Sequence, residues 1–153
     1  MLKANGETIA ENRRARYDYF IEETLEAGLV LEGSEVKSLR HGRASIVEAH
    51  AAEKQGKLYL FNVNIEEYKG ANQFNHDPKR PRLLLLKSRE IRKLISGIQR
   101  QGVTIVPLSL YFNKQGYIKV KLGLAKGKKK ADKRETIKER DWQRQKARSL
   151  KEG

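Results

Sequence analysis

Histidine is scarce in this chain, because His41, His50 and His76 are the only three, and cysteine is absent. The lack of cysteine excludes thiolate zinc sites, disulfides and cysteine nucleophiles. The histidines do not occur at a spacing at which two helical side chains share a metal ion. Neither a glycine-rich phosphate loop nor a serine nucleophile motif is present. We therefore expect no metal and no cofactor.

His76 is the best candidate for a catalytic residue, because it lies in the loop motif Asn75-His76-Asp77-Pro78. A loop histidine that is hydrogen-bonded to the backbone or to RNA explains the motif more simply. Carboxylates paired for general acid–base catalysis are not evident, since Glu22 and Glu23 would point to opposite faces of a strand. We predict that the protein is not an enzyme.

The charge balance indicates a polyanionic partner. The 153 residues include 33 Lys and Arg against 19 Asp and Glu, a formal net charge of +14. Nucleic acid is the expected partner, because each phosphate contact releases counterions. No run approaches the roughly 20 apolar residues of a membrane helix, so no membrane partner is expected. The absence of cysteine and of a secretory leader favours the cytoplasm.

Three basic clusters could bind phosphate, at residues 12–16 (NRRAR), 79–82 (KRPR) and 126–130 (KGKKK). Arginine suits phosphate because its planar fork bonds two oxygens at once. The first cluster could equally be a flexible, solubilising leader. In the second, the flanking prolines limit flexibility and favour a preformed contact surface. The three clusters could converge on one side of a barrel.

Aromatic side chains could add base stacking to these clusters. Tyr68, Phe74 and Tyr117 are candidates, although aromatic residues of strands are more often part of the core. Trp142 is the only tryptophan and lies in the basic C-terminal segment. It could stack on RNA as part of a basic helix, or fold back on the body of the protein.

The last 29 residues differ in composition from the rest. Residues 125–153 hold 12 Lys or Arg against five Asp or Glu, and few large apolar side chains. Residues 132–150 lack Pro and Gly and are rich in helix formers, yet isolated helices of this kind are marginal in water. We expect a tail that is disordered when free and becomes helical against a charged groove.

Residues 1–124 are expected to form one folded body, with residues 1–11 loose. Alternating or continuous apolar patterns predict six strands; these are residues 19–31, 47–53, 57–65, 83–86, 104–112 and 118–124. A short helix is expected at residues 35–40, capped by Ser34, and a longer one from the cap Ser88 to Gly102. This order favours a mainly β fold, a small antiparallel barrel of oligonucleotide-binding (OB) type, with a split α+β sandwich as the alternative.

Five long motifs, in a fixed order, resemble the small protein B family of SsrA-binding proteins. They are residues 12–23 (NRRARYDYFIEE), 33–40 (GSEVKSLR), 74–78 (FNHDP), 123–129 (GLAKGKK) and 132–142 (DKRETIKERDW). The resemblance runs from about Thr8 to the C-terminus. It implies an RNA-binding adaptor that carries transfer-messenger RNA (tmRNA, or SsrA RNA) to stalled ribosomes for trans-translation, the ribosome rescue process that adds a degradation tag.

The resemblance also implies site residues. Those expected to contact the tRNA-like part of the RNA are Asn12, Arg13, Arg14, Glu26, Leu85, Lys87, Gly127, Lys128 and Lys129. Those expected to enter the decoding centre and the empty mRNA channel of the ribosome are Asp132, Lys133, Arg134, Ile137, Lys138 and Trp142. An acid such as Glu26 would accept hydrogen bonds from a 2′-hydroxyl or a base amine. The protein is expected to be a monomer in solution.

The chain departs from the family pattern at Tyr17, where many relatives have histidine, and over residues 45–50 (SIVEAH), where relatives more often show Asp-Ser-Tyr. The second departure concerns any RNA contact that the resemblance would assign to this segment, but not the fold. Two rival functions remain open from the sequence. One is a ribosomal-protein-like structural component that binds ribosomal RNA, and the other is a nuclease or RNA-modifying enzyme with His76 as its key residue.

Overall fold

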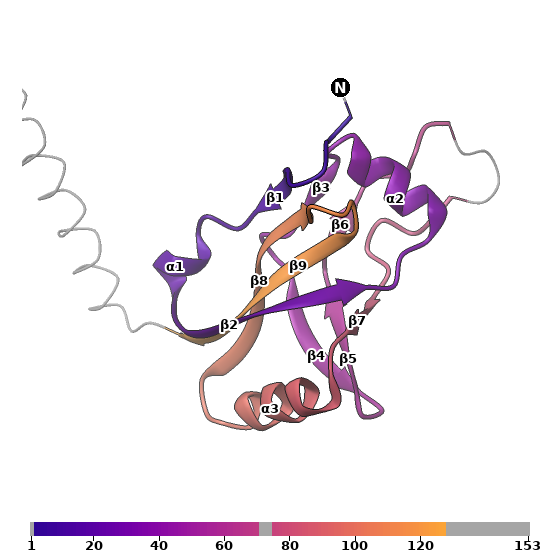
Figure 1. Ribbon diagram of the computed structural model, residues 1–153. Coiled ribbons are helices and arrows are strands. Elements are labelled where there is room, and N and C mark those ends of the chain that lie inside the picture. Colours follow the sequence, from indigo (N-terminus) through magenta and orange to yellow (C-terminus); the bar gives the residue numbers. More distant parts are fainter. Residues whose placement is uncertain (1, 71–74, 128–153) are drawn as a thin grey trace, which may run out of the picture.

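The computed structural model describes residues 2–70 and 75–127, and within them the chain is mainly β with three helices (Figure 1). The helices are α1 (Ala15–Asp18), α2 (Gly33–Arg40) and α3 (Ser88–Ile98). The strands are β1 (Thr8–Glu11), β2 (Tyr19–Leu29), β3 (Ala44–Ser45), β4 (His50–Lys54), β5 (Lys57–Phe61), β6 (Asn64–Ile65), β7 (Arg82–Leu85), β8 (Val103–Phe112) and β9 (Ile118–Gly127). No helix in these two ranges is long and apolar enough to cross a membrane.

Seven strands form one sheet in the order β1-β8-β4-β5-β7-β2-β9, and β9 also pairs with β8. All of these pairings are antiparallel. The long ladders lie on both sides of β9, which runs beside β2 from Tyr19↔Gly127 to Gly28↔Lys119. The strands β3 and β6 pair separately. The predicted mainly β class is therefore confirmed.

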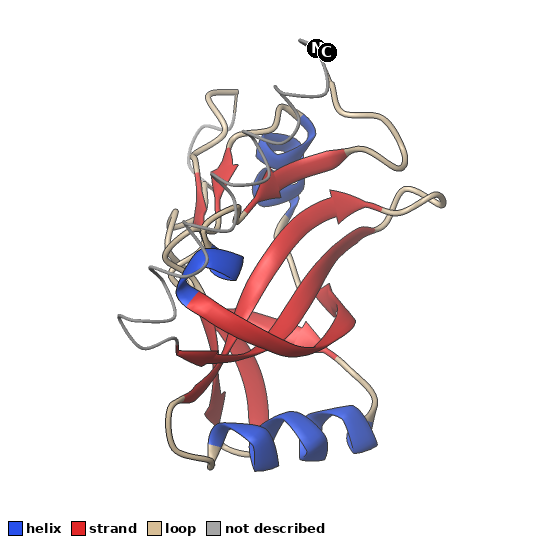
Figure 2. Cartoon of the chain, turned by 90° about the vertical axis from the view of Figure 1, so that its left-hand side faces the viewer, coloured by secondary structure: helices blue, strands red, loops and turns tan. Residues whose placement is uncertain are grey.

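The core follows the alternation of the strands, because every second side chain faces inward. Its fully buried members include Leu58, Leu60, Ile105, Leu110, Val120 and Leu122. The helices α2 and α3 lie at opposite ends of the sheet (Figures 1 and 2). On α3, Leu94 is buried and Gly97 allows close approach, since a Cβ at Gly97 would lie 2.8 Å from the Leu124 side chain.

Both helix caps differ from the prediction. Helix α2 is capped by Glu32, in a capping box with Glu35, and not by Ser34. The Ser34 hydroxyl instead forms a 2.9 Å hydrogen bond with His76 Nδ1. Ser88 is the first residue of α3 and not its cap, and the Glu90 carboxylate accepts a 3.0 Å hydrogen bond from the Lys87 backbone N–H. At each helix the N3 carboxylate accepts a hydrogen bond from the N-cap backbone N–H, so the helix begins one or two residues earlier than a serine cap would place it.

The ends of the body also differ from the prediction. Thr8–Glu11, inside the segment expected to be loose, forms β1 because β8 offers it a pairing edge. Strand β9 continues beyond the expected end at Leu124 to Gly127, because β2 and β8 pair with it on both sides. Helix α1 was not predicted, since four residues are too few for a helical pattern. The tail beyond Gly127 lies outside the described residues.

Candidate nucleic-acid interface

The first basic cluster is attached to the sheet at two points. Asn12 is buried, and its side-chain amide donates a 3.2 Å hydrogen bond to the Pro107 carbonyl of β8. Ala15, at the start of α1, is buried as well. Arg13 and Arg14 remain exposed between these two anchors. The interpretation as a flexible leader is therefore wrong, because the cluster presents its guanidinium groups from a fixed position.

The third basic cluster begins next to the first. Tyr19, which follows α1, pairs with Gly127 at the end of β9, and Phe20 pairs with Lys126. The Gly127 backbone N–H also donates a 3.1 Å hydrogen bond to the Gly102 carbonyl. The pairing of β2 with β9 thus brings residues 12–16 and 126–127 together. The predicted contacts Lys128 and Lys129 lie outside the described residues.

A second group of polar side chains lies further along β2. Glu26 is exposed and pairs with Lys121 of β9, and the next lysine on the same face of β9 is Lys119. The Tyr111 hydroxyl of β8 donates a hydrogen bond to Glu26 Oε2. Burial and this contact with the Glu26 carboxylate raise the pKa of Tyr111 above its ordinary value. The tyrosine therefore stays protonated and orients the carboxylate, which keeps its other oxygen available to accept a hydrogen bond.

Leu85, at the end of β7, extends this group beyond β2, whereas Lys87 is exposed at the N-cap of α3 and does not line the cleft described below. Gly28 pairs with Leu85, and a Cβ at Gly28 would lie 3.3 Å from the Leu85 Cβ. Leu85 is 53% exposed, and Tyr117, on the turn between β8 and β9, is 68% exposed. Both line a cleft of about 330 Å³ that Lys119 also lines. An apolar wall, an aromatic ring and an ammonium group together suit a nucleobase with its phosphate.

The two groups lie along β2, which therefore positions the whole candidate interface. At roughly 3.3 Å per residue, the seven steps from Tyr19 to Glu26 span about 23 Å. The family resemblance indicated Glu26, Leu85 and Lys87, whereas Lys119, Lys121 and Tyr111 were not predicted as site residues. The sequence could have indicated the two lysines as residues of an exposed face, because they alternate with the buried Val120 and Leu122 of β9. The contact between Tyr111 and Glu26 depends on which strands are neighbours.

The second basic cluster, residues 79–82, is not the contact surface that we expected. Arg82 is 0% exposed, and its Nε donates a 2.6 Å hydrogen bond to Glu35 Oε2. Arg80 also forms an ion pair with Glu35. Burial would raise the pKa of Glu35, but the hydrogen bonds from Arg80 and the Glu32 backbone and the charge of Arg82 lower it below its usual range. These arginines stabilise the junction of α2 with β7.

His76 is also structural. It is buried, and besides its bond with the Ser34 hydroxyl its Nε2 lies 2.8 Å from the Ile65 carbonyl oxygen. The expected bond to the backbone is thus confirmed, and both ring nitrogens are occupied. In residues 2–70 and 75–127, no group of three or more His, Asp or Glu is arranged to hold a metal ion. Tyr68 is half-buried and stacks on His41, with ring centroids 6.0 Å apart, while Phe74 lies outside the described residues.

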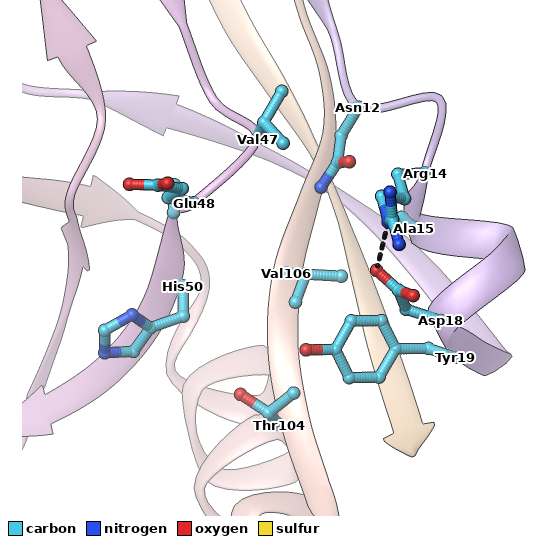
Figure 3. Close-up of a pocket in the computed structure, with 11 residues that line it drawn as sticks. Asn12, Arg14, Ala15, Asp18, Tyr19, Val47, Glu48, His50, Thr104 and Val106 are labelled. Carbon is cyan, nitrogen blue, oxygen red and sulfur yellow. Dashed lines mark ion pairs between the residues drawn. The ribbon is translucent and has the colours of Figure 1, made fainter. Parts of the chain in front are cut away.

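The predicted tail residues cannot be placed in this interface. Asp132, Lys133, Arg134, Ile137, Lys138 and Trp142 lie outside the described residues. Within residues 45–50, where the chain departs from the family pattern, Val47, Glu48 and His50 line a separate cleft. Asn12 and Tyr19 line the same cleft (Figure 3). This cleft was not predicted from the sequence.

Comparison with known proteins gives a consistent set of similarities. The family model described as SmpB protein matches residues 9–152. The SsrA-binding protein of Novosphingobium aromaticivorans is 60% identical over 144 residues, which cover 94% of this chain and 90% of that protein. The SsrA-binding protein of Sphingomonas elodea is 61% identical over 145 residues, which cover 95% and 91%. A solved structure described as "tmRNA-SmpB: a journey to the center of the bacterial ribosome" is 48% identical, with a TM-score of 0.67 over 83% of this chain and 92% of that chain.

Proposed function

Because the chain belongs to the SmpB protein family, we propose that it is an RNA-binding adaptor that binds transfer-messenger RNA and delivers it to stalled ribosomes for trans-translation. The observation that carries this proposal is the antiparallel pairing of β2 with β9. It joins the exposed arginines of residues 12–16 to the end of β9, and it places Glu26 beside Lys121. A basic, partly aromatic face of this kind suits folded RNA.

We further propose that the body is a barrel of OB type. Support comes from β8, which pairs with β4 on one side and with β9 on the other. The successive pairings of β4, β5, β7, β2 and β9 connect these two neighbours of β8. A barrel presents both groups of candidate contacts on the outer side of β2 and β9 while its interior is filled by apolar side chains.

The candidate contacts divide into two kinds. Arg13, Arg14 and Lys121 supply charge for phosphate, and so does the basic sequence that continues from Gly127 through Lys128 and Lys129. Lys87 likewise supplies positive charge. Glu26 and Leu85 recognise other features, because a carboxylate repels phosphate but accepts hydrogen bonds from a base amine or a 2′-hydroxyl, and Leu85 offers an apolar contact. Together the two kinds of contact would favour the tRNA-like part of the RNA over other nucleic acids that a positively charged surface attracts.

The proposed role of the tail is separate from that of the body. Asp132 onward would enter the decoding centre and empty mRNA channel and fold there into a helix. The composition of residues 132–150 supports this, since it combines helix formers and positive charge with too few apolar side chains to form a core. The body would thus bind the RNA, while the tail would test whether the channel is occupied.

We propose that the protein acts without catalysis, as a monomer in the cytoplasm, where ribosomes are found. In favour of a non-enzymatic role, both nitrogens of the best catalytic candidate, His76, are engaged by Ser34 and Ile65. No step of the proposed function requires a cofactor or a resident metal.

The test is a binding titration of the purified protein against transfer-messenger RNA and an elongator tRNA across a salt series. We expect a preference for transfer-messenger RNA that persists at moderate salt, because shape recognition adds to the electrostatic attraction. Equal affinities that fall together with salt would contradict the adaptor role. Stable co-sedimentation with idle ribosomes would instead support a structural ribosomal component.

The division between body and tail is tested by truncation before Ala131. The truncated protein should retain most of its affinity for transfer-messenger RNA, because the described contacts remain. It should not support tagging on stalled ribosomes in a reconstituted translation reaction. Tagging by the truncated protein would refute the proposed division of labour.

A further inference from the structure

A second cleft lies on the other side of residues 12–16 from the basic face, with a volume of about 380 Å³. In Figure 3 the strand β8 contributes Val106 and Thr104 to its floor, and Tyr19 and His50 lie on opposite sides of them. Asn12 lines the upper end in this view. The cleft is therefore open beside the Tyr19 ring, over a floor that is partly apolar, while the His50 imidazole is turned away from Tyr19 in this view.

The two rings are held in place by the packing around them. Tyr19 is half-buried and packs against the small core cluster of Ala15, Val106 and Ala125. His50 stacks on Phe61 of β5, with ring centroids 5.8 Å apart and an angle of 22° between the rings. Rings that are already ordered lose little conformational entropy when a ligand stacks on them.

The charges around this cleft do not favour phosphate. Arg14 lies 3.4 Å from the Asp18 carboxylate, so these two charges largely compensate each other, and Glu48 adds a further negative charge. The groups suited to a ligand are neutral donors and acceptors, namely the hydroxyls of Thr104 and Tyr19. This combination of a ring, an apolar floor and neutral polar groups matches the face and the edge of a nucleobase.

Residues 12–16 separate this cleft from a basic one. Asn12 lines both, and the basic cleft has a volume of about 240 Å³. Arg13, Arg16 and Lys121 also line the basic cleft, and they outnumber its one carboxylate, Glu11, which lies 3.4 Å from Arg13. A base and its phosphate lie on opposite sides of a nucleotide. One short segment with a neutral cleft on one side and a basic cleft on the other can therefore receive both parts of a single RNA strand.

We propose that the cleft between Tyr19 and His50 binds one unstacked RNA nucleobase. The base stacks on the Tyr19 ring, its polar edge meets the Thr104 hydroxyl, and the adjoining phosphates lie at Arg13 and Arg16. This inference rests on the proposed function only in taking RNA as the partner. The base can belong to transfer-messenger RNA or to ribosomal RNA, since the recognition chemistry is the same.

The test compares Tyr19→Leu with Tyr19→Phe, which keeps the aromatic ring. Affinity is measured in two arms, one with transfer-messenger RNA and one with purified ribosomes. Loss of the stacking of one base, worth about 1–3 kcal/mol, corresponds to a decrease in binding affinity of roughly 5- to 150-fold. We expect Tyr19→Leu to lose at least about fivefold in one arm, and Tyr19→Phe to stay within about twofold of the original protein. The arm that responds identifies the source of the base.

A second pair of variants keeps the test decisive if Tyr19→Leu does not fold. His50→Ala removes the imidazole of a residue that lines the cleft, and His41→Ala removes a ring that stacks in the same way on Tyr68 outside it. Thr104→Val removes only the hydroxyl from the floor. We expect His50→Ala and Thr104→Val to weaken the arm that responds, and His41→Ala to leave both arms unchanged.

Two results would overturn this inference. The first is folded Tyr19→Leu, His50→Ala and Thr104→Val proteins that bind in both arms as the original does. The second is an equal loss for His41→Ala. The adaptor role fails separately, if the original protein does not distinguish transfer-messenger RNA from an elongator tRNA.

Discussion

Two arginine-rich segments of this protein have similar sequences, but one exposes its arginines to solvent and the other buries one of them. Residues 12–16 (NRRAR) hold Arg13 and Arg14 on the surface, whereas residues 79–82 (KRPR) place Arg82 in the interior. The two segments differ in what packs against them. Beside the first lie carboxylates that are themselves partly exposed, such as Glu11 and Asp18. Beside the second lies Glu35, whose side chain is 0% exposed.

A buried carboxylate therefore decides whether arginine serves binding or folding. Glu35 accepts hydrogen bonds from Arg80 and Arg82, and Arg82 also donates to the Val63 carbonyl at 2.7 Å. A guanidinium group that is satisfied in this way has no donor geometry left for phosphate. Local composition cannot distinguish the two cases, because the partner is 47 residues away in the chain.

The largest effect is expected from breaking the buried cluster. Glu35→Gln leaves the buried Arg82 without its counter-charge, whereas Arg80 keeps its ion pair with Glu32, so the free energy of unfolding should fall by about 3–5 kcal/mol. Urea denaturation measures it. The matched control is Glu22→Gln, because Glu22 pairs with Arg100 at 2.7 Å on the surface and should contribute no more than about 1 kcal/mol. Equal effects of the two substitutions would contradict the comparison.

The next effect concerns the exposed segment. Arg13→Gln with Arg14→Gln should weaken binding to transfer-messenger RNA by roughly 10- to 100-fold at low salt, and should lower the slope of log affinity against log salt by about 2. Stability should hardly change. Lys54→Gln with Lys57→Gln removes the same charge from the exposed turn between β4 and β5 and should leave the salt slope nearly unchanged. A similar loss in both double variants would mean that only net charge matters.

A smaller effect should follow from removing the hydroxyl that orients Glu26. Tyr111→Phe should weaken binding by about fivefold, the value of one hydrogen bond near 1 kcal/mol. The salt slope should stay constant, since no charge is removed. Combined with Glu26→Gln, the substitution should add little, because the two residues act as a unit. Full additivity in this double-mutant cycle would show that Tyr111 does not act through Glu26.

The smallest effect is the pH dependence that the buried cluster produces. The folded-state pKa of Glu35 lies below the ordinary value of 4.5, so its stabilisation is complete above that value and is lost as the pH falls through the folded-state pKa. Denaturation midpoints between pH 7 and pH 3 should therefore converge for the original protein and Glu35→Gln at acidic pH. A constant difference down to pH 3 would mean that this carboxylate does not contribute to acid unfolding.

Much of the fold followed from local patterns. The alternation along residues 19–31, 104–112 and 118–124 predicted β2, β8 and β9, because one buried face imposes a period of two on a strand. The helical spacing after Ser88 predicted α3. Strand β1 was not predicted, since four residues are too few to show an alternating pattern. The OB-type barrel stays a prediction. The caps of α2 and α3 differed because the carboxylates of Glu35 and Glu90 accept hydrogen bonds from the backbone N–H groups of Glu32 and Lys87, which precede the predicted serine caps.

The chemistry of the site divides in the same way. Composition and family motifs indicated an RNA-binding protein and drew attention to residues 12–16, Glu26 and Leu85, because residue types and their order are properties of the chain alone. Only the tertiary structure decided that Arg82 is buried against Glu35, that Tyr111 orients Glu26, and that Tyr19 and His50 share a cleft. Each of these brings together residues at least 31 positions apart, and an arrangement at that separation is determined by the packing of the whole chain.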